Sequence, residues 1–241
     1  MTEQEKKELQ DRIHSVQERV AQAAVRAGRN PDDITLVAAS KMNDTERVRA
    51  AIEAGIRVCG ENRVQELLDK YEQNAYAGAD LQFIGTLQTN KVKYLIGKVS
   101  LIQSVGSVHL GEAIAKEAAK HQIKQDILLE VNIGREAAKS GLLLEELDEA
   151  VARLSEKPSL HIRGLMAIPP IADQATKNSG YFDEMHQVFV DILTKKYDNV
   201  SMDYLSMGMT NDFETAILCG ANMVRVGTAI FGTRPYQIVS P

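Results

Sequence analysis

The stretch that decides the fold is residues 34–62, ITLVAASKMNDTERVRAAIEAGIRVCGEN. It begins with a short apolar run at 34–39 and contains a second one at 56–59. Between these runs, Val48, Ala51 and Ile52 recur at helical spacing just before Gly55, a pattern typical of one face of a helix. A strand, a helix and a second strand in this order predict one unit of a parallel β/α fold.

The same alternation continues along the chain. The predicted strands are residues 34–39, 56–59, 81–84, 100–104, 126–132, 161–167, 202–206 and 223–226. A closed barrel and an open doubly wound sheet share this alternation, but eight strands without a GxGxxG turn after the first one favour the barrel. We therefore predict the α/β class, with a single (β/α)8 TIM-type barrel over residues 34–232.

A helix is predicted within residues 1–30, ahead of the barrel. Apolar residues recur at spacings of four, three and four from Leu9 to Val20, which places them on one helical face. Thr2 and Glu5 have the spacing of a capping box, so the helix is expected to begin near the first residue.

Two segments are predicted to lie outside the regular elements. Residues 169–180 are rich in Pro, Ala, Asp, Asn and Ser, and this loop is long enough to act as a lid. Residues 233–241 follow the last predicted element as a tail. We find no long linker or repeat between the predicted elements, so residues 1–241 are expected to form one domain.

Composition narrows the class of protein. The 241 residues are 44% hydrophobic and 25% charged, with a net charge of −5, so a basic face for nucleic acid is not expected. No apolar run approaches the roughly 18 residues that cross a bilayer. Cys59 and Cys219 are far apart and match no metal-binding spacing, which indicates a reducing, cytoplasmic location and no metal site.

Lys41 is the first candidate functional residue, because it follows directly on the first predicted strand. In β/α barrels, functional groups come from the carboxyl ends of the strands and the loops after them. Desolvation at the barrel mouth favours a neutral amine, which is a better nucleophile toward an aldehyde. The alternative is a lysine whose ammonium extends out to water.

The loops after the last two predicted strands form a candidate phosphate site, because barrels often bind phosphate there. These loops carry Ser206, Gly208 and Thr210, then Gly227 and Thr228. Glycine lets backbone N–H groups approach an anion closely, and the hydroxyl groups add further donors. A single glycine would mean little, since turns need glycine in any case.

Arg225 is predicted to face the barrel interior two residues before Gly227, since alternate strand residues share a face. A buried guanidinium requires an anion or an acceptor. An ion pair with Glu61 or Asp203 would also satisfy it. Together with Lys41 and the two loops, Arg225 indicates a site for a phosphorylated aldehyde, either pyridoxal 5′-phosphate (PLP) or a sugar phosphate in a Schiff-base barrel.

Longer motifs resemble one known family. They cover nearly the whole chain after the first helix, and they appear in the order LVAASK (36–41), GENRVQE (60–66), FIGTLQTNK (83–91), VNI (131–133), KSG (139–141), RGLM (163–166), LSMGM (205–209) and RVGTAIFG (225–232). In these motifs the chain resembles the pyridoxal phosphate homeostasis protein family and, through it, the barrel domain of alanine racemase. Gln82 departs from the expected pattern, because a histidine commonly precedes the FIG run.

The resemblance implies roles for individual residues. It implies that Lys41 forms the Schiff base, that Asn62 lies near the cofactor ring with Met166 beside it, and that Arg225 faces the pyridine side. The phosphate would be held by Ser206, Gly208, Gly227 and Thr228. Thr210 replaces a serine of the family but keeps the hydroxyl. Lys139 is either a second aldehyde-reactive lysine or, on its position alone, a solvated loop lysine.

The expected function is to hold PLP and deliver it, with little or no turnover. An arginine in place of a carboxylate at the pyridine nitrogen weakens the ring as an electron sink. The chain also ends at Pro241, fifteen residues after the last predicted strand at 223–226, so the second domain of alanine racemase is not expected. We therefore expect a monomer whose partners are PLP and apo-forms of PLP-dependent enzymes. The alternative is a low-activity PLP-dependent amino-acid racemase or lyase.

Overall fold

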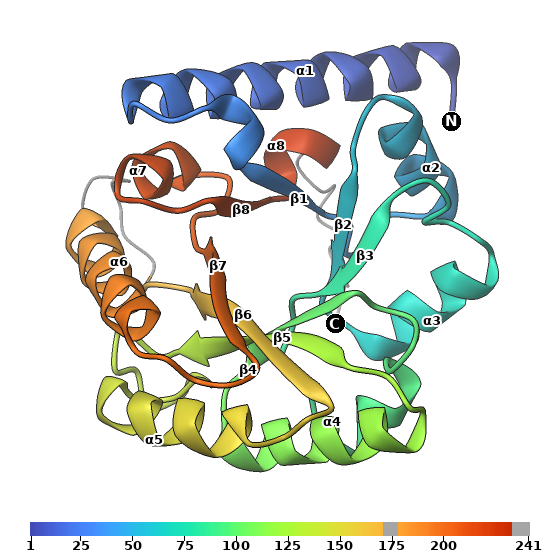
Figure 1. Cartoon of the computed structure of the whole chain (residues 1–241). Helices are drawn as coiled ribbons and strands as arrows, with labels where there is room; N and C mark the ends of the chain where they lie inside the picture. The colour runs from blue at the N-terminus through green and yellow to red at the C-terminus, as the bar shows by residue number, and fades with distance from the viewer. Residues whose placement is uncertain (171–177, 233–241) are drawn as a thin grey trace, which may run out of the picture.

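Eight parallel strands close into a barrel in chain order in the computed structural model, which describes residues 1–170 and 178–232 (Figure 1). The α/β barrel predicted from the eight apolar runs is thus confirmed. The strands are β1 (Thr35–Ala39), β2 (Val58–Glu61), β3 (Asp80–Phe83), β4 (Leu101–Val105), β5 (Gln125–Val131), β6 (Leu160–Ala167), β7 (Val200–Ser206) and β8 (Met223–Val226).

Helices cover the outside of the barrel, and each connection between strands returns the chain to the same end (Figure 1). Between β3 and β4 the connection is a 3-10 helix, η2, and not an α-helix. The helices are α1 (Glu3–Arg26), η1 (Pro31–Asp33), α2 (Thr45–Glu53), α3 (Val64–Glu72), η2 (Thr89–Tyr94), α4 (Val108–Lys120), α5 (Leu144–Ser155), α6 (Ser179–Thr194), α7 (Phe213–Leu218) and α8 (Thr228–Phe231).

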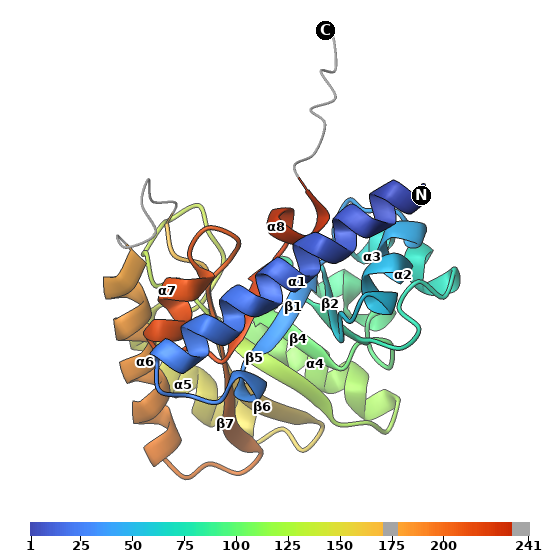
Figure 2. The same ribbon diagram turned by 90° about the horizontal axis from the view of Figure 1, so that it is seen from above.

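The helix α1 crosses the outside of the barrel next to α7 and α8, as both views show (Figures 1 and 2). Its apolar face is buried, in agreement with the predicted spacing. Arg19 pairs with Glu214 of α7 at 2.8 Å, and Arg12 donates to the carbonyl of Ile230 in α8 at 2.8 Å. The helix α1 is therefore anchored to the last two described helices, α7 and α8.

The hydrophobic core divides into two parts, because a barrel strand has an inner and an outer face. The outer cluster fills the space between strands and helices and includes Ala38, Cys59 and Phe83. The inner cluster lies inside the barrel and is built from Val37, Leu101, Leu128, Met166 and Met223. Membership of the inner cluster therefore identifies the side of each strand that faces the barrel axis.

The first turn of α1 supports a prediction about stability. The Thr2 hydroxyl accepts a hydrogen bond from the Glu5 backbone N–H at 3.2 Å, and the Glu5 carboxylate accepts one from the Thr2 backbone N–H at 2.7 Å, as the capping-box spacing predicts. Thr2→Ala is expected to lower the free energy of unfolding by about 1 kcal/mol, the usual effect of losing an N-cap. Urea denaturation would measure this, with Thr2→Ser as the control that keeps the cap. Equal stability of the alanine variant and the natural chain would contradict the prediction.

Two predicted segments fall outside the described residues. Residues 171–177 of the proposed lid and the tail at 233–241 are both outside them. The roles suggested for these segments remain predictions. None of the described helices is long and apolar enough to cross a membrane.

Candidate functional site

Lys41 lies at the carboxyl end of β1, two residues beyond Ala39. Val37 belongs to the inner cluster, and alternation along the strand carries the inward side through Ala39 toward Lys41. The lysine is only partly exposed. The structure therefore places Lys41 at the barrel mouth, on the side predicted from the sequence.

Met166 and Asn62 flank the same interior. Met166 is fully buried in the inner cluster. Asn62 follows β2 directly, and its side-chain Oδ1 is buried with no hydrogen-bond donor among the described residues. A buried acceptor without a donor is costly. The mouth of the barrel thus offers an acceptor at Asn62 to a group with a donor.

A row of polar side chains crosses the barrel interior from β8 to β3. Arg225 donates to the hydroxyl of Ser206 and, at 3.0 Å, to the carbonyl of Ala167. Ser206 donates to Gln103 Oε1 at 2.7 Å, and Gln103 donates to Gln82 Oε1 at 2.6 Å. Since the hydroxyl hydrogen of Ser206 is used within the row, Ser206 would have to rotate its hydroxyl to donate to a phosphate. Gln82, which departs from the family pattern, is the acceptor at the far end.

Arg225 has an unusual electrostatic environment. It is 4% exposed, and among the described residues no carboxylate lies within ion-pairing distance of its guanidinium. Burial lowers the pKa of Arg225 to about 10, although the negative charges of Glu130 and Asp212 act to raise it. An anion or a further polar acceptor beside Arg225 would therefore stabilise this buried charge.

The ion pairs considered as an alternative for Arg225 do not form. Glu61 pairs with Lys70 at 2.7 Å, and Asp203 pairs with Arg163. The physical reason is that each acid already has a cation beside it, Lys70 of α3 for Glu61 and Arg163 of β6 for Asp203. The alternative of a structural ion pair for Arg225 is therefore wrong for both of these acids.

The loops after β7 and β8 lie against each other. The carbonyl of Gly208 accepts from the Arg225 N–H at 3.0 Å, and the Thr210 hydroxyl accepts from the Gly227 N–H at 3.3 Å. Gly208 has a φ of 90°, a conformation that favours glycine. The structure thus brings Gly208, Thr210, Gly227 and Thr228 together.

These two loops also adjoin the end of β1. A Cβ atom placed on Gly227 would lie 3.5 Å from the Cβ and carbonyl oxygen of Ala39. Ala39 precedes Lys41 by two residues, so the paired loops and the lysine occupy the same end of the barrel. The predicted phosphate loops, Arg225 and Lys41 are therefore neighbours in space, although 184 positions separate Lys41 from Arg225 in the sequence.

Glu130 is a second buried charge in the barrel, and sequence reasoning missed it. It lies on β5 and is 7% exposed, and Ser140 donates to both of its carboxylate oxygens. Burial raises the pKa of Glu130, although the Ser140 hydrogen bond and the charge of Arg225 act against this shift. A single acid in an apolar strand carried no signal in the sequence that would mark it as inward-facing.

Glu130 leads to a prediction about pH. Its raised pKa means that the folded chain binds the proton more tightly than the unfolded chain. Its contribution to stability is therefore present at acidic pH and is lost as pH rises through the folded pKa. Glu130→Gln is expected to raise the free energy of unfolding at neutral pH relative to the natural chain, and to make no difference below the ordinary pKa of 4.5. Denaturant titrations across pH would show this, and a constant difference at every pH would contradict it.

Lys139, in contrast, is engaged at the loop surface. Its ammonium pairs with Glu136 in the loop after β5, and about a third of its side chain is exposed. This position matches the solvated loop lysine considered as an alternative.

Among the described residues, no group of three His, Cys, Asp or Glu side chains has the arrangement of a metal site.

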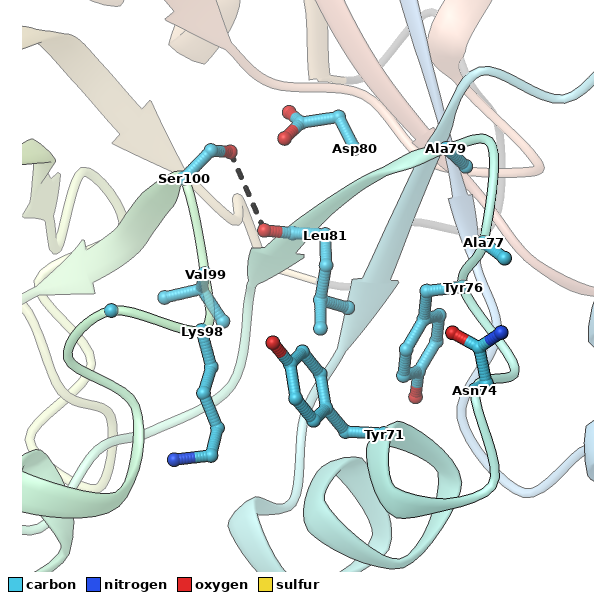
Figure 3. A pocket seen from close by; sticks show the side chains of 11 residues that line it. Tyr71, Asn74, Tyr76, Ala77, Ala79, Asp80, Leu81, Lys98, Val99 and Ser100 are labelled. Carbon is cyan, nitrogen blue, oxygen red and sulfur yellow. Dashed lines mark hydrogen bonds between the residues drawn. The ribbon is translucent and has the colours of Figure 1, made fainter.

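Two surface pockets lie outside the barrel mouth. One, of about 510 Å³, is at the opposite end of the barrel, where Figure 3 shows the side chains of Tyr71, Tyr76 and Lys98 around it. The other, of about 600 Å³, flanks the segment after Lys41 and is lined in part by Met42 and Lys70. Neither pocket contains a residue predicted to bind the ligand, so the candidate site is the barrel mouth itself.

Comparison with known proteins identifies the family of this chain. The family model of the alanine racemase N-terminal domain matches residues 13–235 of this chain. A pyridoxal phosphate homeostasis protein of Aquifex aeolicus is 44% identical over 94% of this chain and 98% of its own length. The protein of the same name from Escherichia coli K12 is 36% identical over 93% of this chain and 96% of its own length.

A solved structure matches the fold as well. The structure of PipY from Synechococcus elongatus PCC7942 with PLP bound superposes with a TM-score of 0.77 at 29% identity. The match covers 88% of this chain and 100% of that one. The relatives thus match most of this chain, and the family model spans all eight strands of the barrel.

Proposed function

Because this chain belongs to the family of pyridoxal phosphate homeostasis proteins, which is built on the alanine racemase N-terminal domain, we propose that it binds PLP as a Schiff base on Lys41 and takes part in PLP homeostasis. The observation that carries the proposal is the juxtaposition of Lys41 with Arg225. The amine of Lys41 lies at the barrel mouth, and the buried guanidinium of Arg225, which no carboxylate pairs with in residues 1–170 and 178–232, lies on the inner wall.

The residues at the mouth fit the chemical groups of PLP. Lys41 would meet the aldehyde, and Arg225 would meet the pyridine side, where the ring nitrogen is an acceptor. Asn62 Oδ1, which has no donor in the part of the chain that the structure describes, would accept a hydrogen bond from a ring substituent. The cofactor would supply an aldehyde that condenses reversibly with amines.

The phosphate would be held by the two paired loops. Gly208 and Gly227 allow the backbone to approach an anion, and Thr210 and Thr228 add hydroxyl donors. Ser206 would contribute after its hydroxyl leaves Gln103. Met166 would pack below the ring as part of the inner cluster.

Attachment of PLP to Lys41 would be a condensation of the aldehyde with the amine. The neutral amine of Lys41 would add to the aldehyde carbon of a bound PLP, so that a C=N bond would replace the C=O bond and one water molecule would leave. The reverse reaction with water releases the aldehyde. Holding would therefore be reversible with water as the only co-reactant and without an oxidant, as delivery to apo-forms of PLP-dependent enzymes would require.

Little turnover is part of the proposal, and it rests on Arg225. PLP enzymes commonly place a carboxylate beside the pyridine nitrogen, which keeps that nitrogen protonated and the ring electron-withdrawing. A guanidinium on this wall disfavours the protonation. The alternative, a low-activity PLP-dependent racemase or lyase, is favoured by the kinship with the alanine racemase barrel.

One experiment separates these functions. The purified protein is titrated with PLP while its visible absorption is followed, and the loaded protein is then incubated with single amino acids in deuterated water. We expect a saturable absorption band and negligible α-proton exchange. Absence of any PLP uptake would end the proposal. Exchange at the rate of a dedicated racemase would replace it with the enzymatic alternative.

Delivery needs its own readout. The loaded protein is mixed with the apo-form of a PLP-dependent enzyme, and recovery of that enzyme's activity is compared with recovery in the same amount of unbound PLP. We expect the activity of the enzyme to recover when the loaded protein is added.

We also propose a cytoplasmic location, since Cys59 and Cys219 are both unpaired thiols in the structure.

A further inference from the structure

We propose that Lys70, on α3, is the positioning residue for Lys41. It would do so by fixing the peptide on both sides of Lys41 from outside the barrel. The inference rests on the proposed function, because it assigns to a buried charge cluster the task of aiming the Schiff-base lysine. The cluster comprises Ser40, Glu61, Glu66, Lys70 and Tyr76.

Lys70 holds the residue before Lys41. Its ammonium donates to the carbonyl oxygen of Ser40 at 2.9 Å, to Glu61 Oε1 at 2.7 Å and to Glu66 Oε1 at 2.7 Å. An ammonium has three donors, and these three acceptors use all of them. The Ser40 hydroxyl also donates to Glu61 Oε1 at 2.7 Å. Ser40 is therefore fixed through both its backbone and its side chain.

The residue after Lys41 is fixed by the same cluster. Glu66 Oε1, which accepts from Lys70, also accepts from the backbone N–H of Met42. Met42 has a φ of 61°, a left-handed conformation that non-glycine residues seldom adopt without support. The turn that directs Lys41 into the barrel mouth is thus attached to α3 on both sides.

Burying this charge cluster costs more free energy than a purely structural role explains. The side chains of Lys70 and Glu61 are 6% and 0% exposed, and burying such a pair often stabilises a fold no more than apolar residues would. Three donors converge on Glu61 Oε1, including the Tyr76 hydroxyl at 3.0 Å, while Glu61 Oε2 has no partner among the described residues. We infer that this cluster fixes the backbone position around Lys41 and adds little to the stability of the fold.

The test uses two ligands that differ at one atom group. PLP forms a Schiff base, whereas pyridoxine 5′-phosphate carries an alcohol in place of the aldehyde and cannot. Both ligands share the ring and the phosphate. Lys70→Met is expected to raise the dissociation constant for PLP about tenfold and to leave that for pyridoxine 5′-phosphate unchanged. Slower borohydride trapping on Lys41 should accompany the loss.

A double variant separates positioning from charge burial. Lys70→Met alone leaves the Glu61 carboxyl without its cation, so it is combined with Glu61→Gln, which removes the charge and keeps the acceptor of Ser40 and Tyr76. We expect the double variant to regain stability but not PLP affinity. If PLP affinity recovers, or if both ligands weaken equally, the inference is wrong.

Controls cover the remaining outcomes. Lys120→Met removes a surface lysine that pairs with Glu117, and both dissociation constants should stay at the natural values. Should Lys70→Met fail to fold, Glu66→Ala makes the same test from the partly exposed end of the cluster. If the natural chain itself binds neither ligand, the proposed function fails. If the natural chain binds both and Lys70→Met matches it, only the positioning role fails.

Discussion

Replacement of Lys41 with alanine is expected to raise the dissociation constant for PLP about a hundredfold, which corresponds to about 2.8 kcal/mol. The substitution removes the only covalent bond in the proposed complex but leaves Arg225 and the loop of Gly227 in place. Residual binding should therefore persist and should resemble the binding of pyridoxine 5′-phosphate. Titration of both ligands, followed by absorption and by quenching of the ligand's fluorescence, would measure the change.

Lys139→Ala is the matched control for this prediction. Lys139 is the other lysine considered as aldehyde-reactive, and it pairs with Glu136 at the loop surface. Its replacement should leave the affinity for PLP and the absorption band as they are in the natural chain. A large loss of affinity in the Lys139 variant with little change in the Lys41 variant would reverse the assignment of the two lysines.

The second large effect is expected from Gly164→Ala, which should lower the free energy of unfolding by about 4 kcal/mol. Gly164 lies on β6 with a φ of 145°, and a Cβ there would stand 1.9 Å from the carbonyl oxygen of Tyr204 on β7. The neighbouring atom belongs to the backbone, so no side-chain rotation relieves the clash. The pairing of β6 with β7 shifts register at this point, between Ile162 and Gly164.

This clash would also reach the site. The same strand pair aligns Met166 with Ser206, so displacement of β7 would move the polar row that includes Arg225. Thermal or urea unfolding would measure the stability, and PLP titration the effect on binding. Gly180→Ala is the control, since Gly180 lies in α6 and a Cβ there meets no atom within 4 Å. Equal stability of the two variants would contradict the prediction.

Much of the fold could be predicted because its determinants are local. Each of the eight apolar runs overlaps one observed strand, and the run at 223–226 coincides with β8. The capping box at Thr2 and Glu5 likewise depends on four consecutive residues. Strand ends then located Lys41 and the two loops, because a parallel barrel brings all its carboxyl ends to one side.

The rest of the site depends on contacts that sequence spacing does not contain. Lys70 looks like an ordinary helical lysine four residues after Glu66, and only the packing of α3 on β2 reveals that it is buried beside Glu61. An ion pair of Arg225 with Glu61 or Asp203 was the alternative interpretation, but Arg225 donates to Ser206 instead. The two acids pair with Lys70 and Arg163. Three-dimensional packing determines which group pairs with a buried charge.

The most direct test of the central proposal is to trap the cofactor chemically. The protein is loaded with PLP, treated with borohydride to convert the C=N bond into a stable C–N bond, digested and mapped by mass spectrometry. We expect the pyridoxyl group on the peptide that contains Lys41, and on no other lysine in stoichiometric amount. Stoichiometric labelling of Lys139 or of another lysine, or recovery of unmodified Lys41 peptide from fully loaded protein, would contradict the proposal.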